Sequence, residues 1–68
     1  MTASELTKTR EVDTFGNVSY VVQDSTGRLV GRIYKMNAGS YRPERLDESY
    51  GPNGSIKHGM EWLARHAI

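Results

Sequence analysis

The side chains best suited to catalysis or metal binding lie near the carboxyl end of the chain. His58 and Glu61 are three residues apart and share a face if this segment is helical, and His66 lies two turns beyond His58. A zinc site needs three or four converging ligands, and the usual His-x-x-x-His spacing is missing. We therefore predict no metal site and interpret these side chains as a solvated helix flank.

The segment from Gly51 to Lys57 is rich in glycine, as phosphate-binding loops are. It lacks the Gly-Lys-Ser/Thr ending, and no buried strand precedes it. A loop followed by a helix cap at Ser55 explains it better. No Ser-His-Asp arrangement can be placed, and so small a chain rarely has room for a small-molecule pocket. The sequence thus predicts a protein that is not an enzyme and that uses no cofactor.

Positive charge is the remaining candidate for chemistry. Between Arg28 and Arg45 the chain holds five basic residues and one acid, Glu44, so this segment carries +4 although the whole chain carries only +1. Basic side chains bind phosphates, and aromatic rings among arginines can stack on unpaired bases. The predicted nucleic-acid-binding set is Arg28, Arg32, Lys35, Arg42, Arg45, Tyr20 and Tyr34. The competing interpretation is that these residues are solvated and pair with nearby acids such as Asp24 and Asp47.

The composition restricts the class of protein. The 68 residues suffice for one domain, expected to span 1–68 with residues 1–6 disordered. The chain has no cysteine, which excludes disulfides, thiolate metal sites and cysteine nucleophiles and favours the cytoplasm. No apolar run approaches the roughly 20 residues of a membrane span, and the first residues lack a signal-peptide pattern. We expect no membrane partner.

Periodicity predicts the helix on which the histidines lie. Ser55 can cap a helix of about 55–67, in which Ile56, Met60 and Leu63 form one apolar stripe. Gly59, on the flank of this stripe, lets the helix approach a sheet closely. The stripe should therefore pack on the strands that precede it.

The strand signals come earlier in the chain. The alternation over 18–36 predicts a hairpin whose turn, 24–27, places Gly27 in the left-handed conformation. The segment 41–46 is predicted as a third strand at an edge, because Pro43 cannot donate to a ladder. The threonine-rich segment 7–15 is compatible with a further strand. The predicted fold class is α+β, a small three-stranded antiparallel sheet packed against one C-terminal helix.

One helix covers only one face of such a sheet, so the other face is free for a partner unless a loop covers it. Regular pairing across the turn places Val22 opposite Val30 on the face assigned to the core. The opposite face then forms the predicted protein interface, which comprises Val21, Leu29, Ile33 and Lys35. The alternative assignment turns that face toward the helix and leaves Tyr20, Arg32 and Tyr34 outside. In a third interpretation an N-terminal strand or the loop 47–54 folds over the free face.

Two known groups of proteins share features with this chain. The order of strands then one amphipathic helix, with the hairpin DSTGRLVGRIYK and its basic outer positions, resembles the arm-type DNA-binding modules of phage and mobile-element integrases over residues 17–67. That resemblance implies a sheet that enters the major groove. The size and the lack of cysteine and of an active site are similar to those of short phage-encoded inhibitors of the anti-CRISPR or anti-restriction type.

The near-neutral charge and the free apolar face together favour a non-catalytic role. We expect a small inhibitor or adaptor that contacts a protein partner, or a second copy of itself, through a sheet face. The alternative is DNA or RNA binding through the basic segment 28–45.

Overall fold

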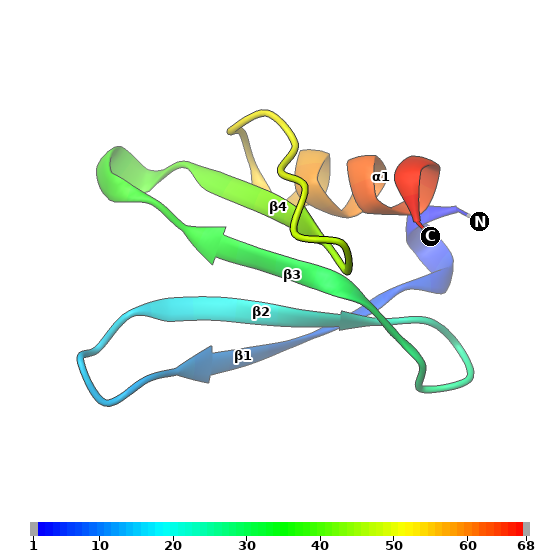
Figure 1. Cartoon of the computed structure of the whole chain (residues 1–68), viewed down its shortest axis with the longest axis horizontal. Coiled ribbons are helices and arrows are strands. Elements are labelled where there is room, and N and C mark those ends of the chain that lie inside the picture. The colour runs from blue at the N-terminus through cyan, green and yellow to red at the C-terminus, as the bar shows by residue number, and fades with distance from the viewer. Residues whose placement is uncertain (1, 68) are drawn as a thin grey trace.

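The computed structural model describes residues 2 to 67 (Figure 1). A four-stranded antiparallel sheet, in the order β1-β2-β3-β4, carries one C-terminal helix. The elements are η1 (Ala3–Glu5), β1 (Thr7–Val12), β2 (Val18–Gln23), β3 (Leu29–Lys35), η2 (Asn37–Gly39), β4 (Tyr41–Arg45) and α1 (Ile56–His66). The predicted α+β class is confirmed, but the sheet has four strands rather than three, because the 7–15 segment contributes β1. Among residues 2 to 67, no helix combines the length and apolar character needed to cross a membrane.

Local signals place the turn and the helix start as predicted. The Asp24 carboxylate accepts hydrogen bonds from the Thr26 and Arg28 amides at 2.9 and 3.0 Å, and Gly27 has a φ of +85°. This left-handed conformation is one that glycine adopts without steric cost. At α1, the Ser55 hydroxyl oxygen accepts a hydrogen bond from the His58 amide at 3.1 Å, which satisfies one orphan donor of the first turn.

The pairing of β2 with β3 differs from the predicted register. Gln23 lies opposite Leu29, but Val22 lies opposite Gly31, so Val30 has no partner and forms a β-bulge. Beyond the bulge every residue of β3 is shifted by one, which exchanges its two faces. Ile33, predicted to lie opposite Ser19, instead lies opposite Tyr20.

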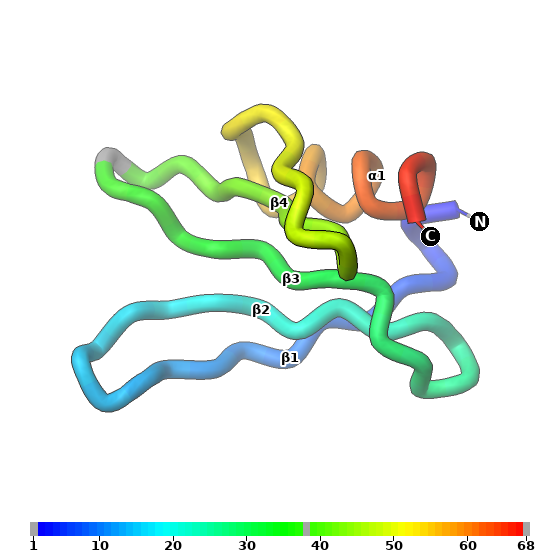
Figure 2. Tube along the Cα trace, viewed as in Figure 1, coloured from blue at the N-terminus to red at the C-terminus, as the bar shows by residue number. Residues whose placement is uncertain are grey.

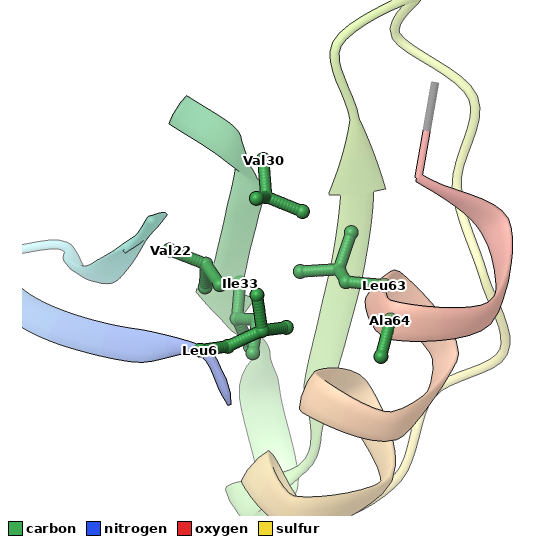
Figure 3. Packing of buried hydrophobic residues seen from close by; sticks show 6 residues of the cluster. All are labelled: Leu6, Val22, Val30, Ile33, Leu63 and Ala64. Atoms are coloured by element: carbon green, nitrogen blue, oxygen red, sulfur yellow. The ribbon is translucent and has the colours of Figure 1, made fainter. Parts of the chain in front are cut away.

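The core therefore combines parts of both predicted faces. It consists of Leu6, Val22, Val30, Ile33, Leu63 and Ala64 (Figure 3). The predicted helix stripe is confirmed, since Leu63 is fully buried and Ile56 and Met60 pack against this cluster. Residues 1–6 were predicted to be disordered, yet η1 forms within them and Leu6 is buried. Burial of a leucine in so small a core holds this end of the chain in place.

Two glycines set how closely the layers approach. A methyl group on Gly31 would meet the carbonyl oxygen of Glu44 in β4 and lie 2.8 Å from the Leu63 side chain. On Gly59 it would lie 3.0 Å from Ile33, which confirms that this glycine lets α1 approach the sheet. The main contacts of α1 are with β4, β3 and η1, so it lies along one side of the sheet and β1 and β2 extend away from it (Figures 1 and 2).

The outer edge of β4 is occupied by the chain's own loop. The Tyr41 amide and carbonyl both bond to Gly54, and the Pro43 carbonyl accepts from the Gly51 amide. At Arg45 the amide donates to Ser49 and the carbonyl accepts from Glu48. Pro43, the central residue of β4, removes no hydrogen bond between β4 and β3, because the N–H that it lacks would point to this outer side. Loop 47–54 thus lines an edge rather than covering a sheet face.

Candidate functional site

The histidine cluster does not form a convergent site. His58 and Glu61 border a shallow surface hollow together with Trp62 and Arg65. The ring of His66 instead packs against Trp62, with ring centroids 4.8 Å apart. Within residues 2 to 67, no group of three or more His, Asp or Glu side chains is placed to hold a metal ion.

The glycine-rich segment is a structural loop. Gly51 lies so close to Trp62 that a methyl group on it would lie 2.6 Å from the indole ring. Gly54 is held in a bridge with Tyr41, and Ser55 caps the helix. The Gly51 amide and both backbone groups of Gly54 are therefore bonded to β4.

The basic segment 28–45 does not form one surface. Arg28 lies at the exposed end of the β2–β3 turn, and Arg45 lies on the helix side of β4. Arg45 donates to the Asp47 carboxylate at 2.9 Å and to the His66 carbonyl at 3.2 Å, so it ties β4 to its loop and to the end of α1. Lys35, opposite Tyr41, also lies on the helix side. Only Arg32 and Arg42 share the opposite side, because strand alternation separates the rest.

The predicted protein interface is corrected in the same way. Ile33 is fully buried beneath α1 and cannot contact a partner. Lys35 shares its face, whereas Val21 and Leu29 lie on the other one. The bulge at Val30 is the physical reason, since it shifts Ile33 and Lys35 by one position. The alternative assignment is equally mixed, because Tyr20 faces the helix while Arg32 and Tyr34 do not.

The surface that remains uncovered is called here the open sheet face. Cross-strand partners fix its membership, since opposed residues of antiparallel strands share a side. It comprises Thr7, Thr9 and Glu11 of β1, Ser19, Val21 and Gln23 of β2, Leu29, Arg32 and Tyr34 of β3, and Arg42 and Glu44 of β4. All four strands contribute, and α1 lies on the other side.

A network of polar side chains crosses the open sheet face. Arg32 contacts the Glu11 carboxylate at 3.1 Å and so joins β3 to β1 across β2. The Tyr34 hydroxyl donates to the Glu44 carboxylate at 3.0 Å and joins β3 to β4. Burial, and secondly this hydrogen bond, raises the pKa of Tyr34, so the phenol stays protonated as a donor.

The network continues beyond β4 into the loop. The Arg42 guanidinium carbon lies 3.9 Å from the centroid of the Tyr50 ring, which is a close cation–π contact. Tyr50 is bridged to Glu44 through the backbone and remains half exposed. Tyr34, Arg42 and Tyr50 line a hollow at this end of the sheet.

Two exposed leucines lie at the opposite end of the open sheet face. Leu29 and Leu46 are both exposed and line a shallow hollow with Arg32 and Glu44 between them. The charges of the whole face cancel, because two arginines, 32 and 42, stand against two glutamates, 11 and 44. The face therefore offers aromatic, apolar and paired polar groups rather than a field of one sign.

Glu11, Glu44, Leu46 and Tyr50 were absent from every predicted binding set. Placing Glu11 beside Arg32 would have required both β1 as a strand and the bulge at Val30, because the bulge moves Arg32 onto the face of Glu11. Tyr50 carried no such signal, because a loop residue reaches the face only through the tertiary path of loop 47–54.

Comparisons of this chain with protein-family models, curated proteins and solved structures give no significant match.

Proposed function

We propose that this protein is a non-catalytic binding module whose open sheet face contacts a protein partner. The observation that supports this most is the Arg–Tyr–Glu network, which reaches from β1 to β4 through residues of β1, β3 and β4 and lies uncovered. Tyrosine and arginine are the residues that most often supply binding energy at protein interfaces. The side chains of Arg32, Tyr34 and Arg42 are already held by neighbours, so less rotamer freedom is lost when a partner binds.

The charge balance favours a protein over a nucleic acid at this face. Phosphate recognition needs arginines free to approach a polyanion, but Arg32 is engaged by Glu11 and a second carboxylate, Glu44, lies next to it. A surface that has no net charge and carries both positive and negative side chains instead suits a protein partner with the complementary arrangement of charges. The resemblance to short phage-encoded inhibitors belongs to the same proposal, since an inhibitor of that kind acts by covering a surface of another protein.

The size of the face suggests where a partner would extend. Three gaps between four strands are about 14 Å across, and five residues of strand are about 17 Å long, which gives a footprint of roughly 240 Å². A standard interface buries about 800 Å² on each partner. A stable complex therefore needs the bordering Leu46 and Tyr50, and the length of β1, whose six residues are all exposed.

Site-specific photocrosslinking tests this proposal in the cells that express the protein. A photoreactive amino acid placed at Thr9 or Leu29 should give a discrete protein adduct. The same group at Lys57 or Arg65, on the exposed part of α1, serves as the matched control. The adduct should weaken when Arg32→Ala is added, because the network then loses its central cation.

An adduct of twice the chain mass would identify a second copy as the partner, whereas a larger defined mass would identify another protein. Equal and diffuse labelling from the sheet and helix positions, in variants with unchanged circular dichroism, would refute the proposal.

A further inference from the structure

We propose a second binding surface, for single-stranded nucleic acid, on the part of the helix side of the sheet that α1 leaves uncovered. It is formed by Lys8 and Arg10 of β1 and Lys35 of β3, called here the basic strand patch. Lys8 and Arg10 lie on the side of the sheet away from the open sheet face, whereas Lys35 also borders the hollow lined by Tyr34 and Arg42. Two of the three cations lie outside the basic segment 28–45.

Strand register places these cations on one side. Lys8 lies opposite the buried Val22, and Arg10 lies opposite Tyr20, so both point to the side on which the core forms. Lys35 follows the buried Ile33 by two residues and shares its side. All three are exposed, because α1 packs mainly over β3, β4 and η1 and because β1 extends away from the helix (Figure 1).

No ion pair involves a cation of the patch within residues 2 to 67. The ion pairs found within residues 2 to 67 are Arg32–Glu11 and Arg45–Asp47, and neither includes a patch residue. The strand acids Glu11 and Glu44 both lie on the open sheet face. The strand positions on the uncovered helix side thus carry three positive charges and no negative one.

Acids do occur at the border of the patch. Asp13 and Glu44 line the same surface hollow as Lys35. The Asp13 carboxylate accepts hydrogen bonds from the Phe15 and Asn17 amides at 2.8 and 2.9 Å, so it is engaged within its own turn. Glu5 accepts from the Thr2 hydroxyl at 2.9 Å, so its carboxylate is engaged within η1. On α1, Glu61 lies in a shallow hollow beside Thr2, and Lys57 precedes it by one turn on the same flank. The nearest helix flank is therefore neutral, because Lys57 balances Glu61.

The spacing of the patch fits a nucleotide chain. Lys8 and Arg10 are two residues apart on β1, which places them about 7 Å apart along the strand. Tyr20 lies opposite Arg10 and diagonal to Lys35 on the sheet, and the centroid of its half-buried ring lies 6.2 Å from that of Tyr41. Cations can contact successive phosphates while a base stacks on the Tyr20 ring, which is the combination that single-stranded nucleic acids use.

The test measures binding of a fluorescent mixed-sequence 20-nucleotide DNA and RNA by anisotropy between 50 and 200 mM salt. The test variant is Lys8→Ala/Arg10→Ala. The matched control is Arg28→Ala/Arg65→Ala, which removes the same charge from two exposed positions outside the patch. Losing two phosphate contacts should reduce the salt slope by about 1.4 and weaken binding at 50 mM about sixtyfold. The control should change affinity by less than about threefold, because charges away from the contact are screened.

Equal losses in the two double variants would show an effect of net charge alone and would overturn the proposal. Absence of oligonucleotide binding by the unaltered protein at 50 mM salt would also overturn the proposal. Sedimentation with vesicles of phosphatidylserine and phosphatidylcholine provides a further arm, and binding to vesicles but not to either oligonucleotide would also refute it. Arg32→Ala alters the open sheet face and should leave oligonucleotide binding unchanged. The proposal of nucleic-acid binding and the proposal of protein binding can therefore fail independently of each other.

Discussion

Replacement of Gly31 by alanine should destabilise the protein more than any other glycine-to-alanine change in the sheet or helix. The added methyl group meets the Glu44 carbonyl oxygen, which belongs to the backbone of β4 and cannot rotate away. It also meets the Leu63 side chain at 2.8 Å. Overpacking costs about 1–3 kcal/mol when side chains can adjust. In Gly31→Ala the backbones of β3 and β4 must separate, so we expect the free energy of unfolding to fall by about 3 kcal/mol, the upper end of this range.

That loss is large for so small a domain. At about 0.05–0.15 kcal/mol per residue, 68 residues give a free energy of unfolding of about 3–10 kcal/mol. With a urea dependence near 1 kcal/mol per molar, the unfolding midpoint of Gly31→Ala should fall by about 3 M. The midpoint is measured by circular dichroism.

Two other glycines provide controls for the same change. A methyl group on Gly54 would contact only the His58 side chain, at 3.3 Å and beyond, so Gly54→Ala should shift the midpoint little. In Gly59→Ala two effects have opposite signs. Alanine stabilises the helix by about 1 kcal/mol relative to glycine, but its methyl group would lie 3.0 Å from the Ile33 side chain, which is destabilising. If Gly31→Ala and Gly54→Ala unfold at the same urea concentration, the claim that β3 and β4 lie too close for a methyl group at position 31 is refuted.

Two further predictions concern the core and the turns. Leu63→Ala should cost about 2–5 kcal/mol, because Leu63 is fully buried, and should lower the thermal midpoint by at least about 8 °C; an unchanged midpoint would contradict the packing of α1 on the sheet. Hydrogen bonds from their own turns hold the pKa values of Asp13, Asp24 and Asp47 below the ordinary 3.8. The unfolded chain takes up these protons first as the pH falls, so their contribution to stability is complete above about pH 5 and is lost progressively as the pH falls through 3.8 and then through the lower folded pKa values. Asp24→Asn should therefore make the acid-induced fall in thermal midpoint smaller.

Local sequence signals predicted the elements but not how they pair. Ser55, Gly27 and the stripe containing Leu63 act through neighbours close in sequence, and each lies where it was predicted. The bulge at Val30 belongs instead to the pairing of β2 with β3, and no local sequence signal marked it. One unpaired residue was enough to exchange the faces of Ile33 and Arg32, and with them the predicted interface.

The sequence did not clearly predict β1, and the physical reason is a different one. All six of its residues are exposed, so no apolar alternation marks it. Pairing with β2, rather than burial of its side chains, keeps it in the sheet. Both proposed surfaces use β1 residues, Glu11 in one and Lys8 and Arg10 in the other, which is why neither was complete from sequence alone.

The loop that occupies the edge of β4 also limits how copies of this chain can assemble. An unpaired strand edge can accept a strand from another molecule. In this sheet only β1 offers such an edge, since the outward groups of Tyr41, Pro43 and Arg45 are bonded to loop 47–54. Two copies that pair β1 with β1 use up both free edges in one twofold-symmetric contact. Continued addition of strands would need a second free edge on each copy, so such assembly closes at a dimer and cannot grow into a fibre.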